Sequence, residues 1–354
     1  MTEIMRTTKC SFSRPSCAPR VHCLVLEISL AVALISGCGH PQVDEKTGPS
    51  STQPTPVADR NDGFISTLDV DALGDHPPWK SYKPGIDAVE VSLKIPPNTP
   101  GNSDRLILYV PHGQHRRHSL GCVFVAPAGA PIFAGNSQAD GDRAEHVPYV
   151  KAGYAVVAFD IDGTFDQNDK TRANMQSTYA KFKAAAGGVV NGKNALEYVL
   201  ARLPEVDPER LYAAGHSSAA IWALLFAEHE PRIKGCIAYA PLPDLFGRSP
   251  SHRATTETHF PGIAQFSPQE GIERLRCPVF VFHADDDHTI PIVITRRFVE
   301  LLKPTNSDVT FHTVPTGDHY RSMIKEGIPQ GIKWLKSLRA EAKSEPTLPV
   351  AEKF

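Results

Sequence analysis

This sequence lacks the features by which nucleic-acid-binding and membrane-spanning proteins are recognised. Its formal net charge is only −2, and its lysines and arginines are not concentrated in one block or interleaved with aromatic residues. We therefore expect no nucleic-acid partner. Outside the N-terminal region no apolar run approaches the roughly 18 residues of a transmembrane helix. These absences favour one large globular body with a small or neutral substrate.

Cysteine is sparse, and its spacing is uninformative. None of the seven cysteines belongs to a Cys-x-x-Cys pair. If the chain is cleaved before Cys38, only Cys122, Cys236 and Cys277 remain free to pair. All three lie in apolar runs that predict buried strands, so we expect small buried hydrophobic residues rather than zinc ligands or a redox pair.

Residues 1–37 have the pattern of a bacterial lipoprotein signal. A basic stretch leads into an apolar run from Cys23 to Ile35, and Ser36 and Gly37 then precede Cys38. Such small residues suit the signal peptidase, and the cysteine becomes the lipidated N-terminus. The basic stretch is long for this class and Glu27 interrupts the apolar run, so a short membrane anchor or a buried helix is the alternative. We expect export and a lipid anchor at Cys38 in a bacterial cell-envelope membrane, facing the periplasm or the exterior.

Composition divides the rest of the chain into three parts. Residues 38–62 are rich in Pro, Ser, Thr and charge, with almost no large apolar residue, which predicts a flexible tether. Residues 341–354 predict a disordered tail. Residues 63–340 alternate apolar and helical patterns and therefore predict a single catalytic domain.

Within that domain the apolar runs are short and separated by helical patterns. Two β-rich segments, Val89 to Ile95 and Leu106 to Val110, predict an antiparallel start. Helical spacing from Val189 to Leu203 ends at Pro204 and Pro208, which we expect to break the helix before the next strand. The later strands are predicted at 122–126, 155–159, 211–214, 236–240, 279–282 and 309–314. Fully apolar strands need helices on both faces, so the fold class is α/β, with a doubly wound, mostly parallel sheet.

One predicted strand runs into a turn of small residues. The segment from Arg210 to Ala219 reads RLYAAGHSSA, and a helical pattern follows. In a nucleophile elbow the serine has a strained backbone and needs small neighbours, here Gly215 and Ala219 around Ser217. Ala219 departs from the second glycine of the G-x-S-x-G pattern. The alternative is an ordinary turn capped by a serine.

A serine nucleophile needs a base and a carboxylate that orients it, and the chain has both later on. Asp285, Asp286 and Asp287 follow the strand at 279–282, and His319 follows the last predicted strand. Each group lies past the carboxyl end of a strand, which is where open parallel sheets place ligands. The residues alone leave the choice among the three carboxylates open.

From Gly121 to Leu338 the chain resembles α/β-hydrolases related to prolyl oligopeptidase catalytic domains and dienelactone hydrolases. Residues 206–210 ahead of Ser217 resemble that family's approach to the elbow, and His283 to Pro291 is similar to its H-G-x-x-D-x-x-V-P loop. The resemblance selects Asp287 and His319, in the order Ser, Asp, His. It implies the α/β-hydrolase fold, no cofactor, and a serine hydrolase that cleaves an ester, peptide or amide bond through an acyl-enzyme.

The resemblance also implies two oxyanion donors. They are the N–H of Ser218 and an N–H from the loop Ala126 to Pro131, for which we choose Ala130. This loop resembles the family's H-G-G-P segment, with alanines replacing the histidine and the second glycine. Three further histidines are expected to be structural, with the His216 side chain pointing away from the pocket; they are His216, His283 and His288.

Several alternatives stay open. The string from His283 to His288 is similar to a metal-hydrolase signature but lacks its second histidine. The altered oxyanion loop and Ala219 favour a binding protein that has lost activity. Peptidase and carboxylesterase are both compatible with a small-molecule ester or short peptide substrate. The choice depends on Leu242 to Glu270, a long segment that predicts a lid or pocket wall.

Overall fold

The computed structural model describes residues 64–103, 105–246 and 250–344. The predicted lipoprotein signal, the predicted tether and most of the predicted tail lie outside these residues. Every helix within the described ranges is too short or too polar to cross a membrane.

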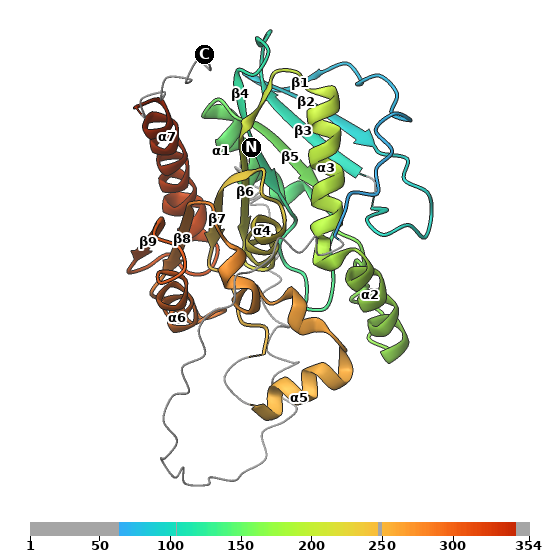
Figure 1. Cartoon of the computed structure of the whole chain (residues 1–354), viewed down its shortest axis with the longest axis vertical. Helices are drawn as coiled ribbons and strands as arrows, with labels where there is room; N and C mark the ends of the chain where they lie inside the picture. Colours follow the sequence, from blue (N-terminus) through green and yellow to red (C-terminus); the bar gives the residue numbers. More distant parts are fainter. Residues whose placement is uncertain (1–63, 104, 247–249, 345–354) are drawn as a thin grey trace, which may run out of the picture. The chain divides into compact units, whose positions relative to one another are not determined.

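A nine-stranded sheet forms the centre of the described body (Figure 1). Its strand order is β1-β2-β3-β5-β4-β6-β7-β8-β9. Neighbours from β1 to β3, and β3 with β5, pair antiparallel, and all later pairs are parallel. The strands are β1 (Lys80–Lys83), β2 (Ile86–Ser92), β3 (Arg105–Pro111), β4 (Leu120–Val125), β5 (Ala155–Phe159), β6 (Val206–His216), β7 (Ile233–Tyr239), β8 (Val279–Ala284) and β9 (Val309–Val314). The predicted sheet with an antiparallel start is confirmed.

Helices cover both faces of this sheet. On one face α1 and α7 contribute Tyr149 and Trp334 to a buried cluster, and on the other α3, α4 and α6 contribute residues such as Phe226 and Phe298. The helices are α1 (Arg143–Lys151), α2 (Arg172–Ala184), α3 (Val189–Arg202), α4 (Ser218–His229), α5 (Pro250–His259), α6 (Ile292–Leu302) and α7 (Ile328–Ser344). The doubly wound arrangement is therefore confirmed.

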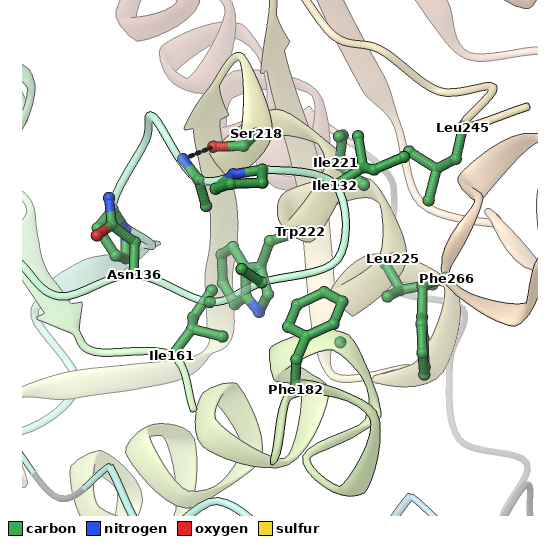
Figure 2. Close-up of a pocket in the computed structure, with 16 residues that line it drawn as sticks. Ile132, Asn136, Ile161, Phe182, Ser218, Ile221, Trp222, Leu225, Leu245 and Phe266 are labelled. Carbon is green, nitrogen blue, oxygen red and sulfur yellow. Dashed lines mark hydrogen bonds between the residues drawn. The ribbon is translucent and has the colours of Figure 1, made fainter. Parts of the chain in front are cut away.

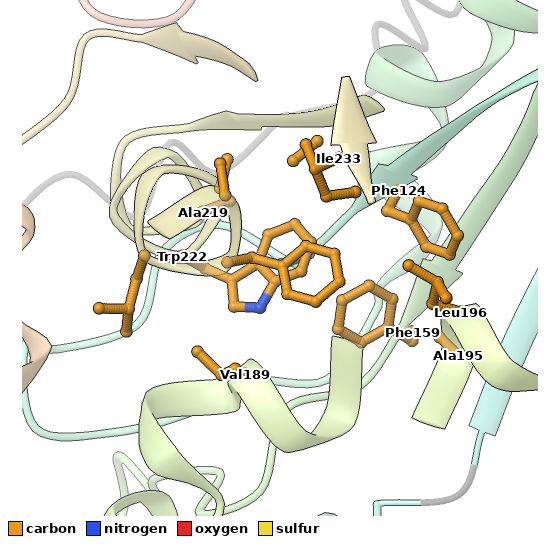
Figure 3. Packing of buried hydrophobic residues seen from close by; sticks show 14 of the residues in the cluster. Phe124, Phe159, Val189, Ala195, Leu196, Ala219, Trp222 and Ile233 are labelled. Carbon is orange, nitrogen blue, oxygen red and sulfur yellow. The ribbon is translucent and has the colours of Figure 1, made fainter. Parts of the chain in front are cut away.

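The two-sided cover explains why the strands are apolar throughout. Along β4 the side chains of Cys122 and Phe124 enter one cluster, and those of Val123 and Val125 enter the other. Because neither face meets water, neither face needs polar residues. Figure 3 shows the first cluster, in which Trp222 of α4 lies edge-on to Phe159 of β5 with ring centroids 4.9 Å apart.

Three local features differ from the predictions. Pro208 lies inside β6 rather than before it, and the register shift between the Leu120–Val206 and Cys122–Leu211 pairs accommodates a residue that cannot donate to the ladder. Helix α7 continues to Ser344. The segment from Leu242 to Glu270 contains α5 and short 3-10 turns.

The described cysteines form no disulfide. Cys122 and Cys236 are buried in β4 and β7, as predicted, whereas Cys277 is partly exposed. Burial raises the pKa of the Cys277 thiol to about 12, so this thiol stays protonated at neutral pH.

A buried carboxylate fixes the segment that precedes β3. Asp162 is only 5% exposed and accepts the backbone N–H groups of Gly101, Asn102 and Ser103 at 2.9, 3.2 and 2.7 Å. The side-chain amide of Asn191 donates a fourth hydrogen bond at 2.9 Å. These donors replace the water that the carboxylate loses on burial.

We predict that Asp162→Ala lowers the free energy of unfolding by about 3 kcal/mol or more, because it leaves several buried donors without an acceptor. Urea denaturation followed by circular dichroism measures this change. Asp166→Ala, at an exposed loop position, is the control and should change stability by less than about 0.5 kcal/mol. Equal stability of the two variants would contradict the assignment.

Candidate active site

Ser217 joins β6 to α4 in a strained backbone conformation. Its φ is 57° and its ψ is −120°, a combination that few residues other than glycine adopt. Its N–H donates to the carbonyl oxygen of Tyr239 in β7 at 2.9 Å. This strand-to-helix turn has the geometry predicted for a nucleophile elbow.

Close backbone contact makes Gly215 obligatory at this turn. A Cβ atom at Gly215 would lie 2.1 Å from the carbonyl oxygen of Ala219 and 2.8 Å from the nitrogen of Ala220. No side-chain adjustment relieves such a contact, because both atoms are backbone. The methyl group of Ala219 is 1% exposed and packs in the core cluster, so alanine is accommodated where the pattern has its second glycine.

The two predicted oxyanion residues come together although 88 positions separate them. The N–H of Ala130 donates to Ser218 Oγ at 3.1 Å (Figure 2). Ser218 is the first residue of α4, where backbone N–H groups have no acceptor within the helix and the helix dipole favours negative charge. Two N–H groups suited to an oxyanion therefore lie beside Ser217.

The carboxylate of Asp287 connects the loop after β8 to the loop after β9. Its Oδ2 atom lies 2.6 Å from His319 Nδ1. Its Oδ1 atom accepts the N–H groups of Thr289 and Ile290 at 2.8 and 2.9 Å. The structure thus selects Asp287 from the three candidate carboxylates as the partner of His319.

The environment of Asp287 favours its ionised form. Burial alone would raise the pKa of this carboxyl group, but hydrogen bonds from His283 and His319 outweigh burial and hold the pKa well below its usual range. Because a carboxylate only accepts, His319 Nδ1 carries the proton of that hydrogen bond. His319 Nε2 is then available to accept a proton.

His283, expected to be structural, is a second partner of Asp287. Its Nε2 atom lies 3.0 Å from Asp287 Oδ2 and 2.9 Å from the carbonyl oxygen of Ile290, while Nδ1 lies 2.8 Å from Thr295 Oγ1. Its side chain is fully buried. His283 therefore holds Asp287 in place from the side opposite the loop amides. The four-residue spacing between His283 and Asp287 was the signal for this role.

The His216 side chain contradicts our expectation that it points away from the pocket. Its ring centroid lies 4.5 Å from that of His319, and its Nε2–H donates to the backbone carbonyl of His319 at 2.9 Å. Burial lowers the pKa of His216 to about 3, so the ring is neutral and supports the histidine loop at physiological pH. His288, by contrast, is exposed.

The two other candidate carboxylates have different partners. Asp286 accepts the backbone N–H groups of Gly317 and Asp318 at 3.0 and 2.9 Å, and so ties the acid loop to the histidine loop. Asp285 is exposed and pairs with Arg296 at 2.9 Å. In the part of the chain that the structure describes, no group of three or more His, Cys, Asp or Glu side chains is arranged to hold a metal ion.

Ser217, Asp287 and His319 lie past the carboxyl ends of β6, β8 and β9. Among the described residues no hydrogen bond joins Ser217 to His319, and the two are linked through His216, which precedes Ser217 and packs on His319. Hydrogen bonds between nucleophile and base often shorten only when substrate binds.

Comparison with protein families places this geometry in a known group. The model of the prolyl oligopeptidase family matches residues 142–338, which is more than half of the chain. The chain belongs to the prolyl oligopeptidase family. It is therefore a serine hydrolase of the α/β-hydrolase superfamily, as the sequence resemblance implied. No curated protein matches the chain.

Solved structures similar to this prolyl oligopeptidase family member share its fold at low identity. An acetyl xylan esterase from Paenibacillus sp. R4 is 16% identical, with a TM-score of 0.53 over 75% of this chain and 90% of the esterase. A cold-adapted esterase from an Arctic intertidal metagenomic library is 15% identical, with a TM-score of 0.51 over 75% and 99%. An acetyl ester-xyloside bifunctional hydrolase from Caldicellulosiruptor lactoaceticus is 17% identical, with a TM-score of 0.51 over 71% and 96%. These likenesses confirm the α/β-hydrolase fold.

We predict that His216 makes the family member less stable in acid. Its folded pKa, about 3, lies below the ordinary value of 6.5, so the unfolded chain binds the proton first. Stability is therefore complete above about pH 6.5 and falls as the pH drops toward 3. His216→Gln should reduce the loss of unfolding free energy between pH 7 and pH 5 by about 2 kcal/mol.

Chemical denaturation at the two pH values measures this difference. His288→Gln, which changes an exposed histidine in the next loop, is the matched control and should retain the wild-type loss. An unchanged loss in His216→Gln would show that His216 does not carry the effect.

Proposed function

We propose that Ser217, His319 and Asp287 form the catalytic triad of this serine hydrolase. The observation that carries the proposal is the 2.6 Å hydrogen bond between His319 Nδ1 and the buried Asp287 carboxylate, beside a strained serine at an elbow. In this arrangement the carboxylate fixes the imidazole tautomer that leaves Nε2 free to accept a proton.

The mechanism follows from these roles. Ser217 Oγ attacks the substrate carbonyl carbon while His319 Nε2 takes its proton, and Asp287 stabilises the imidazolium that forms. The N–H groups of Ser218 and Ala130 receive the oxyanion, for which the hydrogen bond from Ala130 to Ser218 Oγ must open or be shared. His319 then protonates the leaving group, and water releases the acyl group from Ser217 by the same steps in reverse order. No step requires a cofactor.

The substrate class that we propose is a small ester or a short peptide or amide. Membership of the prolyl oligopeptidase family supports peptide or amide cleavage. Carboxylesterase activity is the second candidate, because similar structures are named as esterases of acetylated substrates. The direct comparison is between a p-nitrophenyl acetate assay and an aminoacyl-p-nitroanilide panel.

We predict that Ser217→Ala lowers kcat by about 10⁵-fold or more for whichever substrate is cleaved, because the remaining groups have no nucleophile to activate. The assay uses the full chain and the release of p-nitrophenol or p-nitroaniline. Ser337→Ala, on the exposed side of α7, is the control and should match the wild type. If wild type and Ser217→Ala are equally inert, the binding-protein alternative replaces catalysis.

We further propose that the protein is exported and anchored through lipid on Cys38, on the strength of the sequence of residues 1–38. Because the acyl chains supply the membrane affinity, Cys38→Ala should move the protein from the membrane pellet to the soluble fraction of bacterial cells. Cys277→Ala is the matched control and should stay in the pellet. Retention of both variants in the pellet would contradict the lipid anchor.

A further inference from the structure

A small cavity lies beneath the loop that carries Ala130 (Figure 2). Its volume is about 30 Å³. One face of α4 lines it, at the helical spacing i, i+3, i+4 and i+7, through Ser218, Ile221, Trp222 and Leu225. The cavity therefore begins at the residue that follows Ser217 and runs inward along the helix.

Aromatic side chains close the inner end of this cavity. The rings of Phe182 and Phe266 meet edge to face, with centroids 5.5 Å apart. Gly187 lies between them and α4, where a Cβ atom would be 3.0 Å from the side chains of Leu225 and Phe266. Phe266 and Leu245 come from the segment predicted to be a lid or pocket wall, and they form a pocket wall here.

The lining is apolar. Of the described residues around the cavity, Ser218 and Asn136 have polar side chains and none has an ionisable one. Ser218 Oγ accepts the Ala130 N–H, and the Asn136 amide donates to the carbonyl oxygen of Ala128 at 2.7 Å. A charged group placed in this cavity would lose its hydration without gaining a partner, at a cost of several kcal/mol.

The volume limits the length of an occupant. One water molecule needs about 10 to 15 Å³ on the same measure, so a cavity of this size holds the equivalent of about two waters. That space suits an unbranched chain of about two to four carbon atoms, counted from the carbonyl group.

We propose that this cavity binds the acyl group of the substrate and restricts it to short, unbranched, uncharged chains. The inference rests on the proposed function, in which the N–H groups of Ser218 and Ala130 hold the carbonyl oxygen. The cavity begins at the same two residues, so the chain attached to that carbonyl has a direct path into it. Phe266 and Leu225 then set the longest chain that fits.

The test is the ratio of kcat/KM values for p-nitrophenyl acetate, butyrate and octanoate, measured on the full chain. Wild type should cleave acetate or butyrate at least about ten-fold better than octanoate. Phe266→Ala removes the end wall and should raise the octanoate-to-acetate ratio about ten-fold. Ala134→Leu fills the buried lining and should lower the butyrate-to-acetate ratio about ten-fold.

The matched control is Phe298→Ala, which truncates a fully buried phenylalanine of α6 that does not line the cavity. It should leave both ratios unchanged, and ratios measured on one preparation do not depend on the fraction of folded enzyme. A wild-type preference for octanoate would overturn the acyl-site proposal, as would ratios in Phe266→Ala and Ala134→Leu equal to those of Phe298→Ala. Both results leave Ser217-dependent hydrolysis intact, whereas hydrolysis that survives Ser217→Ala, or no hydrolysis at all, refutes the proposed function itself.

Discussion

The close approach of Gly215 to the backbone of Ala219 is the constraint on which the site depends. It allows β6 to turn into α4 within one residue, and it leaves Ser217 in a conformation that an extended strand or a helix would not adopt. Because α4 starts immediately after Ser217, its N-terminal N–H groups lie at the position where negative charge is proposed to develop. The same helix presents the face that lines the small cavity.

The second constraint is the buried charge of Asp287. A carboxylate that loses water must be compensated, and here two loop amides and two histidines supply the hydrogen bonds. Each of these bonds also fixes a structural element: the loop after β8, the buried end of β8 at His283, and the loop after β9 at His319. Electrostatic compensation and positioning of the base are therefore achieved by one set of contacts.

Much of this arrangement was predictable from the sequence. Continuous apolar runs separated by helices predicted the strands, because burial on both faces removes polar residues from them. The small residues around Ser217 predicted the elbow, because only they permit the backbone contact. The edge strand β1 has the exposed, polar sequence KSYK, which gives no apolar signal, and Pro208 inside β6 depends on a register shift that composition does not reveal.

Contacts between loops were the least predictable. The packing of His216 on His319, the sharing of Asp287 with His283 and the link from Asp286 to Gly317 all join residues whose proximity depends on the assembled sheet. The cavity likewise needs side chains from α2, α4 and two loops. A motif identifies the residue types at such a site, whereas the tertiary fold decides which of them touch.

The most direct test of the central claim is the site of covalent labelling by a fluorophosphonate probe, identified by mass spectrometry of proteolytic peptides. The account predicts a single adduct on Ser217, which disappears in Asp287→Ala protein or at greatly reduced rate if the imidazole is no longer held. An adduct on Ser218 instead, or none on folded wild-type protein, would contradict it.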